Sequence, residues 1–449
     1  MYLIKEVHIK TLVNEEILLI NLINGAADII ERNIYSNLES GDFDKIDNEI
    51  LEKLIERKYL FNSKEEYDAF VEDLNNTIEK FEAQAYPNFL IVPTYDCNLN
   101  CIYCYEQSYE IHSNKNQNDR KLIVDKQFGF INDICSKISK TYTGGFDNRN
   151  VLITLMGGEP LLKNNRDTIR YIFQKIKENN YSFNIVTNGV DLDYYIEDLI
   201  KFQPNYIQIT LDGTKEIHDK RRCFHNKGGS FDIIIENIGK SLDNKIKTYV
   251  RTNVDDKNLK CLPELAEVLH NRFNDNEYLH PYLYLLQDGG CSGDKSILSE
   301  EVGIQEIYSL EKSFPSMKIF TKKFHPSSFI DSIFSNSKFQ PSLSHCSASN
   351  NQYILDYKGN VYKCWHGIGN DDYSIGNILS GEGINQITLD LWRKRSVSKM
   401  DKCITCNYRY ICGTGCPAVQ HVDYKNFDVS KPYCVEYKGL IDVITSEYL

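Results

Sequence analysis

The sequence contains no apolar run long enough to cross a membrane. Its longest apolar stretch, residues 17–23, is interrupted at Asn21, whereas a membrane-spanning helix needs about 20 mainly apolar residues. Residues 1–6 also lack the charged start and the apolar core of a signal peptide. We therefore expect a cytoplasmic protein that has no membrane partner.

Positive charge is also scarce. The chain has 51 Lys and Arg against 63 Asp and Glu, which gives a net charge of -12, and it contains no basic run. Sequence-independent binding of nucleic acid needs a Lys and Arg footprint, so we expect no nucleic-acid partner. The 14 cysteines indicate metal binding rather than disulfides in a cytoplasmic protein.

Three cysteines lie close together in the first quarter of the chain. Cys97, Cys101 and Cys104 have the spacing CX3CX2C. Thiolates favour iron-sulfur clusters or zinc, and a closed zinc site needs four ligands. Because no fourth Cys or His is near, the triplet favours a four-iron cluster with one open iron. Three buried or zinc-bound cysteines are the alternative.

Four more motifs follow the triplet, and each comes after an apolar, β-branched run. They are Met-Gly-Gly-Glu-Pro at 156–160, Val-Thr-Asn-Gly at 186–189, Ile-Thr-Leu-Asp-Gly at 209–213 and Arg-Thr-Asn-Val-Asp at 251–255. Together with the triplet, this order resembles the radical S-adenosylmethionine (SAM) enzymes. The resemblance implies that SAM chelates the open iron and that an electron from the cluster cleaves it to a 5'-deoxyadenosyl radical.

The same resemblance implies a set of SAM contacts. The backbone around Gly158 and Glu159 would bind the methionine amino group, and Tyr103 would pack against the adenine. Thr210 matches a hydroxyl that contacts SAM, and Arg222 matches a guanidinium that reaches its carboxylate; a planar fork suits such a group. A surface salt bridge is the alternative for Arg222, and we expect His218 to be structural.

The hydrophobic pattern predicts an α/β fold. Strands are expected near 88–95, 150–156, 183–187, 205–211, 247–253 and 279–286, alternating with helical patterns at 123–138, 169–176, 233–242 and 262–273. Six such units make a partial (β/α)6 TIM barrel, the radical SAM core. All the motifs fall at the C-terminal ends of strands, where α/β barrels carry their reactive groups.

Seven cysteines crowd the last quarter of the chain, and two close pairs among them would suit a zinc ribbon. With the triplet present, and with Gly359 five residues before Cys364, the pattern instead resembles the SPASM extension of radical SAM enzymes. That implies two auxiliary clusters, for a total of three 4Fe-4S clusters. The first would be held by Cys346, Cys364 and Cys416, and the second by Cys403, Cys406, Cys412 and Cys434.

The first auxiliary set has only three cysteines. Sulfatase maturases add another cysteine six residues before the first SPASM position, where this chain has Gln340. An iron left open could bind a substrate cysteine, lower the pKa of its thiol and hold its sulfur near a carbon radical, so that a thioether forms. Cys291, another residue or water could instead fill the position.

Residues 1–85 lie outside both units. Strand-like runs at 3–7 and 17–23 precede helical patterns at 33–38, 46–57 and 64–81. This order resembles the winged-helix-like domain with which peptide-modifying radical SAM enzymes bind the leader of a precursor peptide; a plain helical cap is the alternative. The expected domains are 1–85 for peptide recognition, 86–290 for the barrel, 291–340 as a bridge and 341–449 as the SPASM domain.

The leading hypothesis is a radical SAM maturase of a ribosomally made peptide, which forms a Cys thioether crosslink. Its partners would be the precursor peptide and a flavodoxin or ferredoxin-type electron donor. The alternatives are an anaerobic sulfatase maturase, a maturase that forms carbon-carbon crosslinks, and a binding protein with structural clusters. Sulfatase maturases usually start close to their triplet and carry an Asp where this chain has Trp365. No general base is assigned.

Overall fold

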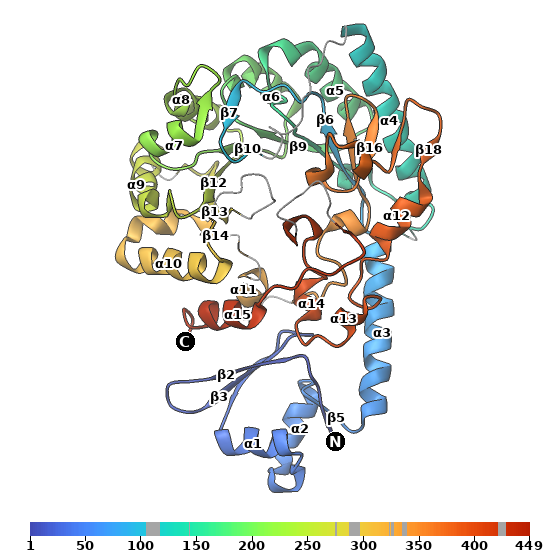
Figure 1. The fold of residues 1–449 in the computed structure, drawn as a ribbon, viewed down its shortest axis with the longest axis vertical. Helices are drawn as coiled ribbons and strands as arrows, with labels where there is room; N and C mark the ends of the chain where they lie inside the picture. Colours follow the sequence, from blue (N-terminus) through green and yellow to red (C-terminus); the bar gives the residue numbers. More distant parts are fainter. Residues whose placement is uncertain are drawn as a thin grey trace.

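A curved parallel sheet forms the centre of the molecule (Figure 1). The computed structural model describes residues 1–104, 117–142, 144–273, 276–286, 297–322, 324, 327–334, 339–420 and 428–449. Cys291 lies outside these residues, so its suggested role as a cluster ligand stays a prediction.

Six parallel strands make up the barrel, and neighbours in the sheet are also neighbours in this series. They are β6 (Asn88–Val92), β8 (Leu152–Leu155), β9 (Ser182–Thr187), β10 (Tyr206–Thr210), β12 (Thr248–Val254) and β13 (Leu279–Leu285). All six strands predicted from the sequence are present, and the predicted α/β fold with a partial barrel is confirmed.

Helices cover the outer side of this curved sheet (Figure 1). They are α4 (Gln117–Ser139), α5 (Arg166–Glu178), α6 (Ile196–Phe202), α7 (Lys215–Arg221), α8 (Phe231–Asp243) and α9 (Leu262–Phe273). Their apolar faces pack on alternate strand residues, as Ile234 of α8 does in one core with Ile207 and Ile209 of β10. The other residues of each strand face inward, and on β12 Tyr249 and Arg251 are only partly buried.

The sheet continues into the cysteine-rich region. Strand β15 (Gln352–Asp356) pairs in parallel with β6, from Gln352 opposite Asn88 to Asp356 opposite Val92. Antiparallel strands β16 (Asn360–Tyr362), β17 (Gly376–Asn377) and β18 (Gly383–Ile384) follow it, and β14 (Thr321–Lys322) adds to β13 at the opposite edge. The hairpin of β15 and β16, which follows Cys346, is therefore part of the barrel sheet. Gly359 turns it with a φ of +89°, a conformation that suits glycine.

Short helices complete the C-terminal half. They are α10 (Glu300–Ser313), α11 (Ser327–Phe334), α12 (Gln386–Arg393), α13 (Asp401–Ile404), α14 (Arg409–Cys412) and α15 (Tyr437–Thr445). In Figure 1, α13, α14 and α15 lie between the barrel and the N-terminal elements.

The N-terminal residues form a three-stranded antiparallel sheet with three helices. The strands are β2 (Val7–Thr11), β3 (Ile17–Asn21) and β4 (Ala27–Ile30), and the helices are α1 (Arg32–Ser40), α2 (Asn48–Glu56) and α3 (Lys64–Ala83); β1 (Tyr2–Leu3) pairs with β5 (Leu60–Phe61). The predicted run at 3–7 is divided between β1 and β2. Strand β4 was not predicted, because four residues are too few for a clear period.

The N-terminal elements share a core with the cysteine-rich region. Leu343, Val397 and Tyr410 belong to the same apolar cluster as Leu54 and Tyr59. A buried ion pair crosses the same contact: Arg409 lies 2.8 Å from Glu6, and their side chains are 5% and 0% exposed. Residues 1–85 are thus packed firmly against the region of Cys403 to Cys412.

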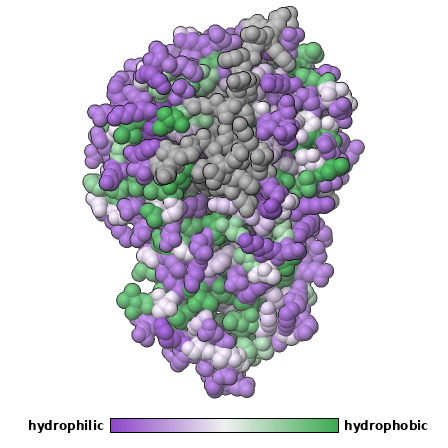
Figure 2. Space-filling model, in the orientation of Figure 1, coloured by the Kyte–Doolittle hydropathy of each residue, from purple (hydrophilic) through white to green (hydrophobic). Residues whose placement is uncertain are grey.

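The coloured part of the face seen in Figure 2 is mainly polar. Figure 2 shows hydrophilic residues over most of the visible face, with hydrophobic ones in small patches. In the described part of the chain, no helix is long and apolar enough to span a membrane.

Candidate functional site

The middle cysteine of the triplet ends a short strand that pairs with a second short strand, which follows α7 in the chain. Strand β7 (Leu99–Cys101) is antiparallel to β11 (Arg222–Phe224), with Cys101 opposite Arg222. The N–H of Ile102 also donates to the carbonyl of Arg221 at 3.0 Å. This pairing brings the triplet and Arg222, 118 or more residues apart, to the same place.

The predicted cluster ligands raise the pKa values of one another's thiols, and they do so within the predicted sets. Burial, then Glu159, raises the pKa of Cys97, and Cys101 and Cys104 add to the effect. Burial raises the pKa of Cys364 well above its ordinary value, and Cys416 and Cys346 contribute next.

The second auxiliary set, which contains Cys412, shows the same mutual effect on thiol pKa values. Burial raises the pKa of Cys412 to about 12, with further contributions from Cys403, Cys406 and Cys434. The structure therefore brings together the members of each of the three sets that the resemblance implies. Their function as ligands stays a prediction.

The donor chemistry of these sets suits iron-sulfur clusters. All three consist of thiols, which deprotonate readily only when a positive group is near, and iron supplies one. In the described part of the chain, no three His, Cys, Asp or Glu side chains converge closely enough to hold a single metal ion. Cluster ligands, by contrast, bind different irons and need not converge on one point.

Gly158 packs against the backbone that leads into the triplet. Its N–H donates to the carbonyl of Thr94 at 3.2 Å, and the N–H of Glu159 donates to that of Asp96 at 2.9 Å. A Cβ on Gly158 would lie 2.3 Å from the oxygen of Tyr95 and 2.5 Å from that of Asp96. Only glycine fits this contact, which sets the position of the triplet relative to β8.

The Glu159 side chain ties neighbouring strand ends together. Its carboxylate accepts hydrogen bonds from the hydroxyl of Thr187 at 2.7 Å and from the N–H groups of Asn188 at 2.6 Å and Leu161 at 2.8 Å. Burial raises its pKa to about 7, although these bonds oppose the shift. These three bonds hold the Glu159 carboxylate in place, and the resemblance assigns the backbone at this position to the ligand.

Tyr103 and Arg222 meet in a buried polar cluster. The Tyr103 hydroxyl donates to Asp212 and accepts from Arg222 at 2.7 Å and from the Asn253 amide at 3.2 Å. Within the described residues, the buried Nε of Arg222 has no hydrogen-bond partner. A donor of this kind can still bind an anionic group, so Arg222 fits the predicted contact with a carboxylate.

Asp212 and Asn253 were not named as site residues from the sequence. Asp212 is fully buried and lies 3.6 Å from Nε of Arg221. Both residues stand in motifs that end strands, and that position was the signal that could have identified them. His218 is buried, accepts from the N–H of Asp212 at 3.1 Å and contacts Ser230 at 3.0 Å, which agrees with a structural role.

Contacts on the inner wall of the barrel connect Thr210 with Cys416 of the first auxiliary set. Thr210, at the end of β10, is opposite Arg251 of β12. The guanidinium of Arg251 lies 4.1 Å from the ring centre of Tyr284 on β13. Burial raises the pKa of Tyr284, Arg251 opposes the shift, and Cys416 adds to it. Cys416, one of the three cysteines of the first auxiliary set, therefore acts on a residue of the barrel interior.

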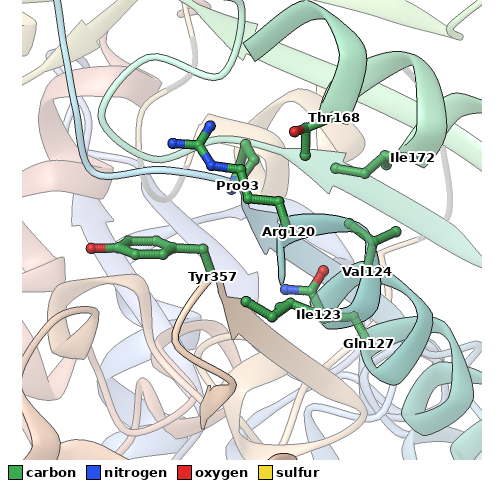
Figure 3. Close-up of a pocket in the computed structure, with 8 residues that line it drawn as sticks. All are labelled: Pro93, Arg120, Ile123, Val124, Gln127, Thr168, Ile172 and Tyr357. Carbon is green, nitrogen blue, oxygen red and sulfur yellow. The ribbon is translucent and has the colours of Figure 1, made fainter. Parts of the chain in front are cut away.

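A small, mostly apolar pocket is lined mainly by residues of α4 and α5. Figure 3 shows its lining, in which Arg120, Val124 and Gln127 of α4 and Thr168 and Ile172 of α5 surround a gap closed by Tyr357. None of the eight lining residues is among those predicted to bind SAM or iron.

The fold and the site together define a class: an α/β partial barrel with a cysteine triplet at the C-terminal end of its strands. Residues 91–269 match the model of the Radical SAM superfamily. This part of the chain is a radical SAM domain. Such a domain implies a four-iron cluster and SAM.

Several known proteins are similar to most of the chain, among them two curated proteins and one solved structure. The cysteine-type anaerobic sulfatase-maturating enzyme of Clostridium novyi is 25% identical over 373 residues, 77% of this chain and 92% of that protein. The radical SAM cyclopropyl synthase TigE of Paramaledivibacter caminithermalis is 24% identical over 431 residues, 91% and 84% of the two chains.

The structure is that of Streptococcus suis SuiB bound to its precursor peptide SuiA. It has a TM-score of 0.53 and 14% identity, and it covers 95% of this chain and 98% of its own. At this identity the likeness concerns the fold alone. It extends over nearly the whole chain.

Proposed function

We propose that the chain is a SPASM-type radical SAM maturase, which modifies a ribosomally made precursor peptide and forms a Cys thioether crosslink. One observation carries the proposal: among the described residues Cys346, Cys364 and Cys416 act on one another, and Cys416 also acts on Tyr284 at the barrel interior. A peptide that enters the barrel would meet both this group and the triplet.

The ten grouped cysteines would hold three clusters. Cys97, Cys101 and Cys104 would hold the cluster that binds SAM, which supplies a 5'-deoxyadenosyl radical when bound. Gly158 and Glu159 would offer backbone groups to the methionine part, Arg222 would bind its carboxylate, and Tyr103 and Thr210 would complete the site. Because Tyr103 is held by Arg222, Asp212 and Asn253, its ring is fixed before SAM arrives.

Thioether formation fits a three-cysteine group, because a four-iron cluster on three protein ligands leaves one iron for a substrate thiolate. The balance of the reaction is simple. The acceptor carbon loses one hydrogen atom, the substrate thiol loses a proton, and one electron is passed on. The product is about two daltons lighter than the substrate, as loss of two hydrogens requires.

The N-terminal elements would recruit the leader of the peptide. SuiB, whose fold covers nearly the whole chain, is described as bound to a precursor peptide. A strand of the leader could add to an edge of the sheet of β2, β3 and β4. A flavodoxin or ferredoxin-type protein would deliver the electrons.

The similar proteins also support alternatives. The Clostridium novyi protein matures a sulfatase, and TigE is a cyclopropyl synthase. Trp365, which is 44% exposed directly after Cys364, takes the position of the expected general base of the sulfatase maturases. This difference favours a peptide maturase over formylglycine formation.

The test uses the peptide encoded by a short, cysteine-rich reading frame beside the gene. Reconstituted enzyme, SAM and dithionite should yield 5'-deoxyadenosine and a peptide about two daltons lighter, and a Cys→Ala precursor should stay unmodified. Loss of two hydrogens at the same acceptor residue in the Cys→Ala peptide would indicate a carbon-carbon crosslink. Conversion of the cysteine itself to an aldehyde would establish a sulfatase maturase.

A further inference from the structure

Arg395 is the largest fully buried side chain of the described residues. Its guanidinium donates four hydrogen bonds, and all four go to backbone carbonyls. One nitrogen donates to Thr414 at 3.1 Å and Gly415 at 2.8 Å, and the other donates to Val429 at 3.0 Å and Lys431 at 2.5 Å. Neutral carbonyls satisfy its N–H groups but do not balance its charge.

The position of Arg395 is central to the cysteine-rich region. Thr414 and Gly415 lie between Cys412 and Cys416, and Val429 and Lys431 lie just before Cys434. The guanidinium therefore joins the segment shared by both predicted auxiliary clusters to the segment that brings the last ligand of the second one.

Cysteines of both auxiliary sets surround this guanidinium and act on its charge when they are deprotonated. Burial lowers the pKa of Arg395, and the opposing effects come from Cys416, Cys346, Cys403 and Cys412. Two of these cysteines belong to the first group and two to the second. An isolated charge in a protein interior is very costly unless an opposite charge is near, and thiolate-bound iron-sulfur clusters carry negative charge.

We propose that Arg395 is a positioning residue that holds one fixed positive charge between the two auxiliary clusters and raises the reduction potentials of both. The inference rests on the two auxiliary clusters of the proposed function. Reduction adds negative charge to a cluster, so a buried positive charge nearby favours the reduced form; cluster charge and hydrogen bonding are established determinants of these potentials. One residue would thus set both potentials together.

The test is a redox titration of the reconstituted auxiliary clusters, followed by electron paramagnetic resonance. In Arg395→Gln both potentials should become more negative, whereas Arg395→Lys, which keeps the charge, should stay close to wild type. Lys402→Gln is the matched control, because it removes one charge from an exposed residue beside Cys403. Its potentials should not change, since water screens an exposed charge.

Each result decides the question. Unchanged potentials in Arg395→Gln would overturn the proposal, as would loss of both auxiliary clusters in Arg395→Lys, which would make the residue a structural clamp. Loss of the clusters in Arg395→Gln but not in Arg395→Lys would support it, because the charge alone would then be what the site requires. A wild-type protein with only four irons would instead refute the auxiliary clusters of the proposed function, and with them the basis of this inference.

Discussion

At the scale of single residues, the contact between Gly158 and the triplet loop leaves no space for a side chain. Gly158→Ala should sharply reduce both iron bound at the triplet and 5'-deoxyadenosine formation, because its Cβ would lie 2.3 Å from a backbone oxygen that has no room to move. The measurement is iron content with product quantified by chromatography.

Gly129→Ala is the control for this substitution. Gly129 lies in α4, and a Cβ there meets nothing within 4 Å, so this variant should match wild type or be slightly more stable. Equal activity of Gly158→Ala and Gly129→Ala would show that the close contact at Gly158 does not position the triplet.

A second prediction concerns the buried ion pair of Glu6 and Arg409. Glu6→Gln should destabilise the protein by about 3 kcal/mol, because it leaves Arg409 buried without its counter-charge. Glu15→Gln is the control: Glu15 and Arg32 are 3.9 Å apart with side chains 81% and 54% exposed, so its loss should be nearly neutral. Chemical denaturation under anaerobic conditions measures both; equal effects would contradict the prediction.

Most individual site residues could be predicted from motifs, and their partners could not. The motif at 209–213 pointed to Thr210, yet the bond from Tyr103 to Asp212 depends on the pairing of β7 with β11. Arg395 stands in no motif at all. Its importance follows only from the four carbonyls that the folded chain brings around it.

At the scale of elements, β2 is attached to α15 through His8. The ring contacts the hydroxyl of Tyr408 and the carboxylate of Asp442, each at 3.1 Å. Burial lowers the pKa of His8, and this effect exceeds the opposing effect of Asp442. The folded protein therefore keeps His8 neutral at a pH where the unfolded chain, with a pKa of about 6.5, already binds a proton.

The lowered pKa of His8 makes the folded protein less stable in acid. The stability that His8 contributes is present above about pH 6.5 and falls as the pH drops below it, by at most about 1.4 kcal/mol for each pH unit. Wild type should thus lose more thermal stability than His8→Gln between pH 7.5 and 5.5. Parallel curves for the two proteins would contradict this reading.

The strands of the barrel were predictable because each shows a clear apolar, β-branched run. The pairing of β15 with β6 was not, since these strands are more than 250 residues apart and a parallel neighbour leaves no local signal. Through this pairing the regions expected as separate domains, 86–290 and 341–449, share one sheet, and nothing local in the sequence indicates it.

At the scale of the whole molecule, the N-terminal elements cannot be removed without consequence. Deleting residues 1–85 would expose Cys403, which is buried in the core shared with those elements, and would remove the partner of Arg409. The deletion should therefore reduce iron bound at the second auxiliary group as well as peptide modification. Full iron content with slow modification would instead show recruitment of the peptide to be the sole role of these residues.

The central claim is that ten cysteines form three cluster sites and that the triplet alone cleaves SAM. The most direct measurement combines iron content and 5'-deoxyadenosine formation in the variant with Cys97, Cys101 and Cys104 all replaced by Ala. Wild type should hold about twelve irons and the variant about eight, at four irons to a cluster, and the variant should form no 5'-deoxyadenosine. Product formed by the variant, or a wild type with four irons and one zinc, would contradict the account.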